Sequence, residues 1–232
     1  MPERAAPTDD HTPLPRIVVL VSGQGRNLQA LIQACSDGRI AGKIVAVVSN
    51  VVDAPALARA TEAGLPVRVL AHAAYPSRAA FDRALLATVD TLRPQVVALA
   101  GYMRILDDAF VDRYSGRLLN IHPSLLPRFP GLHTHRRALE AGDAEHGATV
   151  HFVTRELDGG AAVIQGRVMV EPHDDVESLA NRVMREVECK IYPQVLAWFC
   201  RGDLSWGTGR IWFGNRPLDT PLKLEDLQEE FR

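Results

Sequence analysis

The segment Ile17–Leu28, IVVLVSGQGRNL, decides the fold that this chain can adopt. Its first part is an unbroken apolar run, Ile17–Val21, which predicts a buried strand. A glycine-rich turn follows, and Asn27–Cys35 then has the apolar spacing of an amphipathic helix. A buried strand that enters a helix through a tight turn is the opening unit of a parallel α/β sheet.

The same alternation continues through the first half of the chain. The apolar patterns predict further strands over Lys43–Ser49, Pro66–Leu70, Gln95–Gly101 and Arg117–His122, separated by helices over Ala54–Ala63, Ser77–Leu92 and Asp107–Tyr114. The strand over Gln95–Gly101 is nearly all apolar, which is typical of a sheet covered by helices on both faces.

The second half has a different pattern. Strands over Ala148–Val153 and Ala162–Val170 are separated by too few residues for a crossover helix, so they should pair antiparallel. A long amphipathic helix is expected from Val176 to Cys200, followed by a hairpin with Gly214–Asn215 in its turn and a charged tail from Asp219 that should fray. The predicted fold class is α/β: a Rossmann-like, doubly wound, mainly parallel sheet with an antiparallel C-terminal part and a long C-terminal helix.

Composition limits the classes of function. The 232 residues are 47% apolar and 23% charged, which suits one ordinary globular domain. We expect a disordered leader over residues 1–15, a single domain over 16–202, and a C-terminal hairpin and tail over 203–232. The net charge of −2 gives no reason to expect a nucleic-acid partner. The three cysteines are scattered, and neither a signal peptide nor a membrane segment is visible, so we expect a cytoplasmic protein with no membrane partner.

The glycine-rich turn is a candidate anion site. Glycines allow the backbone to approach a ligand, and the start of a helix offers unpaired N–H groups to an anion. Gly25, Arg26 and Asn27 stand at this position. The spacing is neither that of a dinucleotide fingerprint nor that of a P-loop, so a single phosphate is favoured over a dinucleotide or ATP. A tight turn without a ligand is the alternative.

Asn120 and His122 lie two residues apart at the end of a predicted strand, so their side chains point to the same side. An amide beside an imidazole is suited to hold an oxygen that becomes negative during acyl transfer. Asp158, in a turn with two glycines, is the best candidate to orient the imidazole. Taken singly, each of these motifs is more often structural than functional.

Other kinds of chemistry fit less well. Ser22 lacks the context of a hydrolase nucleophile, and Ser124 lies in a proline-rich loop, so a reaction in which the substrate's own amine attacks fits better. His133, His135, His146 and His151 do not have zinc-site spacing, and no metal site is expected.

Several stretches together resemble the phosphoribosylglycinamide formyltransferase family of folate-dependent enzymes. They are SGQGRN (22–27), AGYMRIL (100–106), LNIHPSLLP (119–127), PGLHTH (130–135) and ELDGG (156–160). These stretches span roughly residues 16–199 in the family's order and spacing. The resemblance implies transfer of the formyl group of 10-formyltetrahydrofolate to the amine of glycinamide ribonucleotide in purine synthesis.

The resemblance also implies roles for individual residues. The catalytic trio would be Asn120, His122 and Asp158. Residues implied to bind the phosphate and ribose are Gly25, Arg26, Asn27, Gly101, Met103, Pro123 and Glu188. Residues implied to bind the folate are Arg78, Met103, Arg104, Ile105, Leu106, Val153 and Thr154. No metal is implied, and we expect a monomer or a homodimer.

Two departures from the family pattern are visible. Arg26 stands where members often have a serine, and one residue is inserted in the long helix before Glu188. Three alternatives stay open: a formyltetrahydrofolate deformylase, which resembles a chain with an extra N-terminal domain; a methionyl-tRNA formyltransferase, which resembles a longer chain with a basic C-terminal domain; and a folate-binding module without catalysis.

Overall fold

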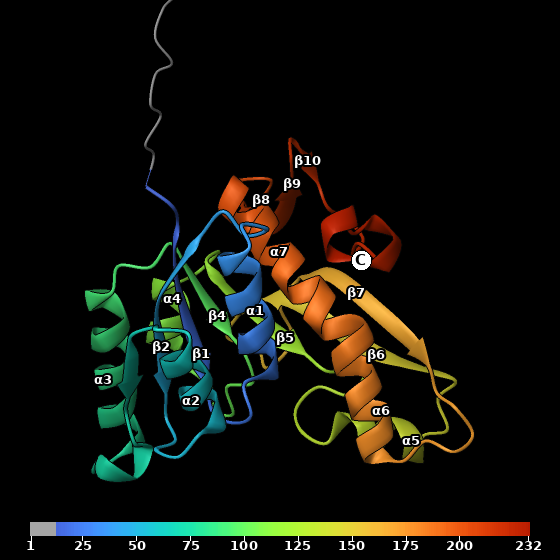
Figure 1. Cartoon of the computed structure of the whole chain (residues 1–232), viewed down its shortest axis with the longest axis horizontal. Helices are drawn as coiled ribbons and strands as arrows, with labels where there is room; N and C mark the ends of the chain where they lie inside the picture. The colour runs from blue at the N-terminus through green and yellow to red at the C-terminus, as the bar shows by residue number, and fades with distance from the viewer. Residues whose placement is uncertain (1–12) are drawn as a thin grey trace, which may run out of the picture.

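The computed structural model describes residues 13–232, and within them the chain builds a mixed seven-stranded sheet (Figure 1). The strand order is β3-β2-β1-β4-β5-β6-β7. The strands are β1 (Arg16–Val21), β2 (Lys43–Ser49), β3 (Val67–Val69), β4 (Val96–Leu99), β5 (Leu118–His122), β6 (Glu145–Phe152) and β7 (Ala162–Met169). Every pairing from β3 to β5 is parallel, and β6–β7 is antiparallel, as the sequence predicts. The β5–β6 pairing is also antiparallel.

Helices cover both faces of this sheet (Figure 1). They are α1 (Arg26–Ser36), α2 (Pro55–Glu62), α3 (Arg78–Thr91), α4 (Asp108–Arg113), α5 (Thr134–Glu140), α6 (Val176–Val183) and α7 (Cys189–Arg201). Alternate residues of β1 divide between two cores because strand side chains alternate in direction. Ile17 and Val19 pack with residues of α1, α6 and α7, whereas Val18 and Leu20 pack with residues of α3 and α4. The doubly wound fold class is therefore confirmed.

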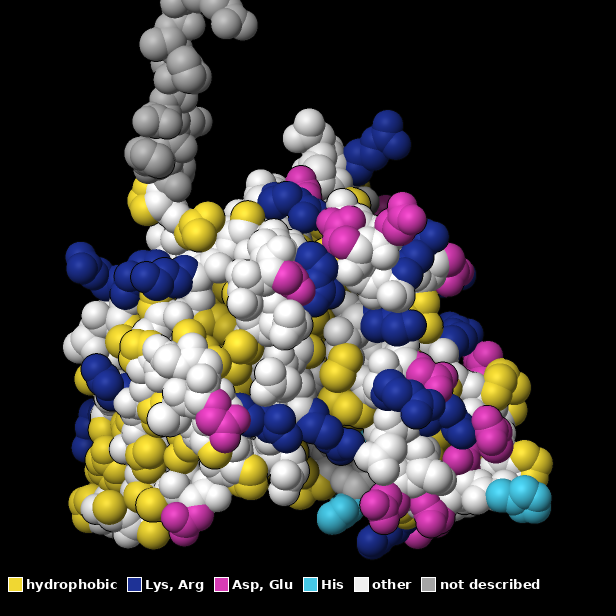
Figure 2. Space-filling view, in the orientation of Figure 1, with side chains coloured by type: hydrophobic (Ala, Val, Ile, Leu, Met, Phe, Trp, Pro, Cys, Tyr) yellow, Lys and Arg dark blue, Asp and Glu magenta, His cyan; other side chains and the backbone are white. Residues whose placement is uncertain are grey.

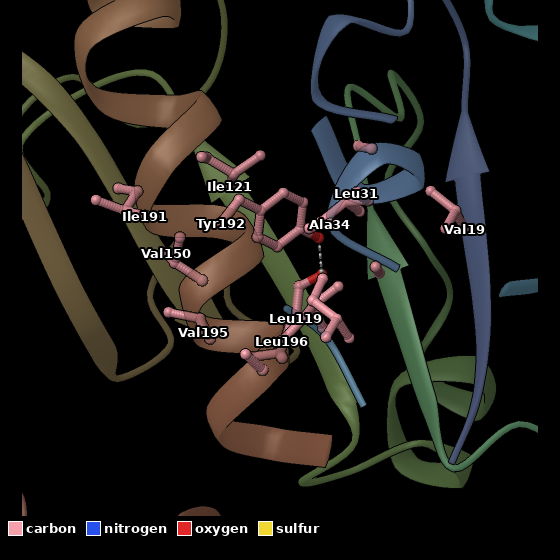
Figure 3. Close-up of a cluster of buried hydrophobic side chains, with 14 of the residues drawn as sticks. Val19, Leu31, Ala34, Leu119, Ile121, Val150, Ile191, Tyr192, Val195 and Leu196 are labelled. Carbon is pink, nitrogen blue, oxygen red and sulfur yellow. Dashed lines mark hydrogen bonds between the residues drawn. The ribbon is translucent and has the colours of Figure 1, made fainter. Parts of the chain in front are cut away.

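Tyr192 of α7 ties the long C-terminal helix to the sheet (Figure 3). Its side chain is fully buried, and its hydroxyl lies 3.0 Å from the carbonyl oxygen of Leu99 and 3.1 Å from that of Leu119. The hydroxyl donates to these carbonyls at the point where β4 and β5 lie side by side. A buried phenol needs such a partner, because an unsatisfied hydroxyl costs free energy in an apolar core.

The long helix differs from the prediction in its middle. The sequence predicts one continuous helix from Val176 to Cys200, but a π-helical turn, Met184–Glu188, separates α6 from α7. A π turn holds one extra residue within an otherwise α-helical path. The π turn lies where the resemblance to the family predicts one inserted residue before Glu188.

The C-terminal segment also corrects the prediction. The expected hairpin is present, with β9 (Arg210–Phe213) and β10 (Arg216–Pro217) joined through Gly214–Asn215, but β8 (Leu204–Gly207) precedes it and was not predicted. The expectation of a frayed tail is wrong. Leu222 exchanges backbone hydrogen bonds with Val163 and Gln165 of β7, and this contact covers the edge of the sheet.

Two short 3₁₀ turns complete the tail, Leu224–Asp226 and Glu229–Phe231, and another lies at His72–Ala74. Leu227 and Phe231 are buried in the same core as α1 and α7, so charge patterning alone misjudged the tail. α5 was likewise not predicted. Of the expected leader, residues 1–12 lie outside the described residues, and β1 begins at Arg16 as expected.

Replacement of Phe231 by alanine tests the packing of the tail. The ring is 2% exposed and carries the Arg39 guanidinium 5.3 Å from its centroid. Phe231→Ala should lower the free energy of unfolding by about 3 kcal/mol, because it leaves a cavity in the main core. Urea denaturation measures this, with the exposed Glu229→Ala as control. Equal stability of the two variants would contradict a packed tail.

Candidate active site

The turn between β1 and α1 is built by close packing. Gly25 has φ of 72°, in the left-handed region, and a Cβ atom there would lie 2.6 Å from the Cβ of Ala56 on α2. Only glycine satisfies both the conformation and the space. The turn therefore brings the start of α1 against α2, and Ser22 links it to the next loop because its Oγ accepts from the backbone N–H of Met103 at 2.8 Å.

Two side chains of this turn reach the long C-terminal helix. The Asn27 amide donates to Glu188 Oε2 at 2.6 Å, and the Arg26 guanidinium donates to Asn181 Oδ1 at 2.6 Å. Asn27 Oδ1 is buried and, within residues 13–232, has no hydrogen-bond partner. The residues that the sequence assigns to phosphate and ribose binding thus converge from opposite ends of the chain. Figure 2 shows a hollow between the region of α1 and α2 and that of α5 and α6, with Lys and Arg side chains along its upper rim.

Glu188 is a buried carboxyl group in this cluster. It is 4% exposed, and burial raises its pKa to about 7, although the Asn27 hydrogen bond and the nearby Arg26 charge act in the opposite direction. A carboxyl group with a pKa near 7 exchanges its proton in the physiological range.

The predicted trio also comes together. His122, the last residue of β5, is buried, and its Nδ1 lies 3.5 Å from Asp158 Oδ2. Its Nε2 lies 2.9 Å from the carbonyl oxygen of Phe129. Both ring nitrogens therefore face oxygen acceptors, a surrounding that suits an imidazolium with a proton on each nitrogen.

Asp158 is held by the backbone around it. Its φ of 52° is unusual for a residue other than glycine, and Asp and Asn tolerate this region better than most side chains. Its Oδ2 also accepts from the backbone N–H of Gly131 at 2.8 Å. The loop that follows His122 and the loop between β6 and β7 thus meet at one carboxylate.

The residues expected at the folate lie in and around the loop that follows β4. Met103 and Ile105 are strongly exposed, with 67% and 57% of their surface accessible, so two large apolar side chains of this loop face solvent. Arg78 donates to the carbonyl oxygen of Ile105 at 3.1 Å. Arg104 stacks over Phe81 at 4.7 Å, and its buried Nε has no partner within residues 13–232.

The other predicted residues lie close to these two groups or beside them in the chain. Gly101 accepts from the backbone N–H of Ser22 at 3.1 Å, which joins it to the glycine turn. Pro123 follows His122 and is half-buried. Leu106 and Val153 pack against the core that contains Val18 and Leu20. The N–H of Val153 donates to the carbonyl oxygen of Leu118. Thr154, half-buried, bonds only to the neighbouring backbone carbonyl of Glu156 among the described residues.

The sequence reasoning missed one histidine of the site. His151 was considered only as a metal ligand, yet it lies directly opposite Asn120 in the β5–β6 pair, with its Nε2 3.1 Å from Asn120 Nδ2. His151 lies near the end of the predicted strand, as Asn120 does. The two could be paired only once the register of β5 against β6 was known. His135 and His146 bond to each other at 3.0 Å, and burial lowers the pKa of each to about 4.

Residues 13–232 contain no group of three or more His, Cys, Asp or Glu side chains arranged to hold a metal ion. They also contain no helix with the length and apolar character needed to cross a bilayer.

The sheet topology, the glycine turn and the converging trio define an α/β enzyme of the group-transfer class. Within that class the chain belongs to the formyl transferase family, because the family model described as Formyl transferase matches residues 15–196.

One such relative is the phosphoribosylglycinamide formyltransferase of Escherichia coli (strain K12), which is 52% identical over 202 residues, covering 87% of this chain and 95% of the relative. A solved phosphoribosylglycinamide formyltransferase from Coxiella burnetii superposes with a TM-score of 0.86 at 45% identity, covering 91% of this chain and 99% of that one. The trifunctional purine biosynthetic protein adenosine-3 of Homo sapiens is 41% identical over 84% of this chain and 19% of its own length.

The buried Glu188 makes stability depend on pH. Its folded pKa is raised from 4.5 to about 7, so its contribution to stability is present below pH 4.5 and is lost as pH rises through about 7. Glu188→Gln removes the buried charge and can still accept from Asn27. This variant should therefore melt at a higher temperature than the parent at pH 8, and the difference should shrink towards pH 5.

Melting curves across this pH range provide the measurement. Glu186→Gln is the matched control, because Glu186 lies in the same π turn but is 43% exposed. The raised pKa would be contradicted if the melting temperatures of Glu188→Gln and the parent differ by the same amount at pH 8 and at pH 5.

Proposed function

We propose that this protein transfers the formyl group of 10-formyltetrahydrofolate to the amine of glycinamide ribonucleotide, a step of purine biosynthesis. The observation that carries the proposal is the convergence of His122, at the end of β5, with Asp158, 3.5 Å away in a separate loop. Asn120 is joined to this pair through His151, which lies 3.1 Å from Asn120 Nδ2 and 3.8 Å from Asp158 Oδ1. Its support from outside the chain is the high identity over nearly the full length of relatives with this activity in their names. We also propose that the enzyme works in the cytoplasm, as a monomer or a homodimer.

The proposed reaction needs no nucleophile from the protein. The substrate amine attacks the formyl carbon, a new C–N bond forms, and the formyl oxygen takes up negative charge. Asn120 donates a hydrogen bond to this oxygen, and the protonated His122, whose N–H groups face Asp158 and the Phe129 carbonyl, stabilises the negative charge by its own positive charge. An electron pair of the negative oxygen then re-forms the carbonyl double bond, and the bond between the formyl carbon and N10 of the folate breaks with its electron pair going to N10.

One proton must move from the attacking amine to the departing N10. Asp158 is the group proposed to relay it through water, because its Oδ2 lies 3.5 Å from His122 Nδ1 and its Oδ1 lies 3.8 Å from His151 Nε2. The same carboxylate stabilises the imidazolium while the formyl oxygen is negative. General acid–base help of this kind typically contributes on the order of a hundredfold to ten-thousandfold in rate.

The glycine turn is proposed to bind the phosphate of the ribonucleotide. Backbone N–H groups at the start of α1 and the Arg26 guanidinium supply the positive end of this site. Glu188 and Asn27 are proposed to bind the ribose, with Gly101, Met103 and Pro123 around them. Arg26 stands where the family pattern often has a serine. Because its side chain extends towards Asn181, it does not crowd the turn, and its charge is proposed to strengthen phosphate binding.

The folate is proposed to lie along the loop after β4. The exposed apolar side chains of Met103 and Ile105 give a surface for its rings, together with Arg104, Leu106, Val153 and Thr154. Arg78, 3.1 Å from the Ile105 carbonyl, has its charge near the same loop and would face the acidic tail of the folate.

An assay for folate release tests the proposed function. Purified protein is mixed with 10-formyltetrahydrofolate, and tetrahydrofolate formation is followed with and without glycinamide ribonucleotide. We expect release only when the ribonucleotide is present. Release without it would favour a deformylase, whereas folate binding without any release would favour a non-catalytic binding module.

Asp158→Asn isolates the proposed proton relay. Asparagine tolerates the left-handed backbone at this position and can still accept from Gly131, so the fold should be kept. We expect kcat to fall by about a hundredfold or more, with little change in the KM of either substrate. Steady-state kinetics measures this, and Asp37→Asn, an exposed aspartate in an ion pair with Arg39, is the control. Near-normal turnover of Asp158→Asn would remove Asp158 from the mechanism.

A further inference from the structure

His151 is a buried histidine that the proposed mechanism does not use. It lies on β6 directly opposite Asn120 in the antiparallel β5–β6 register, and 2% of its surface is exposed. Its Nδ1 lies 3.0 Å from the carbonyl oxygen of Phe152, and its Nε2 lies 3.1 Å from Asn120 Nδ2. The ring therefore spans from the backbone of its own strand to the amide that is proposed to hold the formyl oxygen.

The partners of the two ring nitrogens select one tautomer. A backbone carbonyl can only accept, so Nδ1 must carry the proton and donate to Phe152. A neutral ring then has an acceptor at Nε2, which faces the Asn120 amide nitrogen. Burial lowers the pKa of His151, in keeping with a neutral ring, although Asp158 Oδ1 at 3.8 Å acts in the opposite direction.

The backbone around the ring is built to hold this contact. A Cβ atom on Gly160 would lie 1.7 Å from the Phe152 carbonyl oxygen and 3.3 Å from His151 Nδ1. The second glycine of the Asp158-Gly159-Gly160 turn is thus required for the chain to pass over the Phe152–His151 hydrogen bond. This close approach links the turn that presents Asp158 to the strand that presents His151.

We propose that His151 is a positioning residue: its unprotonated Nε2 accepts from Asn120 and so orients the Asn120 amide with its N–H groups, not its carbonyl, towards the reacting formyl oxygen. An asparagine side chain can rotate by half a turn at little cost, and the wrong orientation would direct an oxygen at the developing negative charge. The acceptor on β6 removes this freedom before the substrate arrives. The catalytic consequence of this inference rests on the proposed function. The tautomer rests only on the contacts of His151 with Phe152 and Asn120.

Two substitutions separate orientation from general stability. In His151→Gln, the side-chain oxygen can stand where Nε2 accepts from Asn120, whereas the bond to Phe152 is lost. In His151→Asn, the shorter amide can keep the bond to Phe152 but cannot reach Asn120. Loss of one hydrogen bond that orients a reacting group should lower kcat by about tenfold in His151→Asn. The KM values should be unchanged, and His151→Gln should recover most of kcat.

His146→Asn is the matched control, because it also replaces a buried histidine of β6, but one that bonds to His135 and not to Asn120. It should lower the melting temperature without lowering kcat. A double variant gives a further measurement: if His151 acts through Asn120, then Asn120→Ala with His151→Asn should be no slower than Asn120→Ala alone. Equal loss of kcat in the Gln and Asn variants, or multiplied losses in the double variant, would overturn the proposal.

A readout without substrates keeps this inference separate from the proposed function. NMR of protein with ¹⁵N-labelled histidine at pH 7 should give a neutral His151 with the proton on Nδ1, assigned by its loss in His151→Gln. A doubly protonated ring, or a proton on Nε2, would overturn the inference even if the enzyme is active. Absence of ribonucleotide-dependent release by the parent protein would instead defeat the proposed function, with the tautomer result standing by itself.

Discussion

The antiparallel pairing of β5 with β6 is the constraint on which the site depends. Because β6 runs against the direction of the parallel strands, Asn120 is set opposite His151, and the chain leaves β6 into a loop that returns Asp158 to His122. A parallel strand at this position would have required a crossover connection and would have carried the next loop away. One change of strand direction therefore gathers an amide, two imidazoles and a carboxylate.

A second long-range contact couples the glycine turn to the C-terminal helix. Asn27 bonds to Glu188, which is the last residue of the π turn Met184–Glu188 in that helix. Tyr192, further along the same helix, bonds to the carbonyls of Leu99 and Leu119. The helix is thus held at the sheet by a buried phenol and meets the glycine turn with a buried carboxyl group, so its position affects both the core and the candidate site.

Much of the fold was predictable because its signals are local. The apolar runs of β1, β2 and β4, and the amphipathic pattern of α1, depend only on neighbouring residues, and each predicted element is present. β8 and the buried tail were not predicted, because Leu227 and Phe231 are isolated apolar residues in a charged segment. Their burial depends on packing in the core that they share with α1 and α7, which no local pattern describes.

The sequence by itself determined the strand–helix order, the glycine turn and, through its resemblance to a family, the identity of Asn120, His122 and Asp158 as a set. Only the tertiary structure decided that His122 Nδ1 lies beside Asp158, that Asn120 faces His151, and that Arg26 bonds to Asn181. The physical reason is that strand register and loop return are set by packing across the sheet. Residues far apart in the chain become neighbours only when that packing is complete.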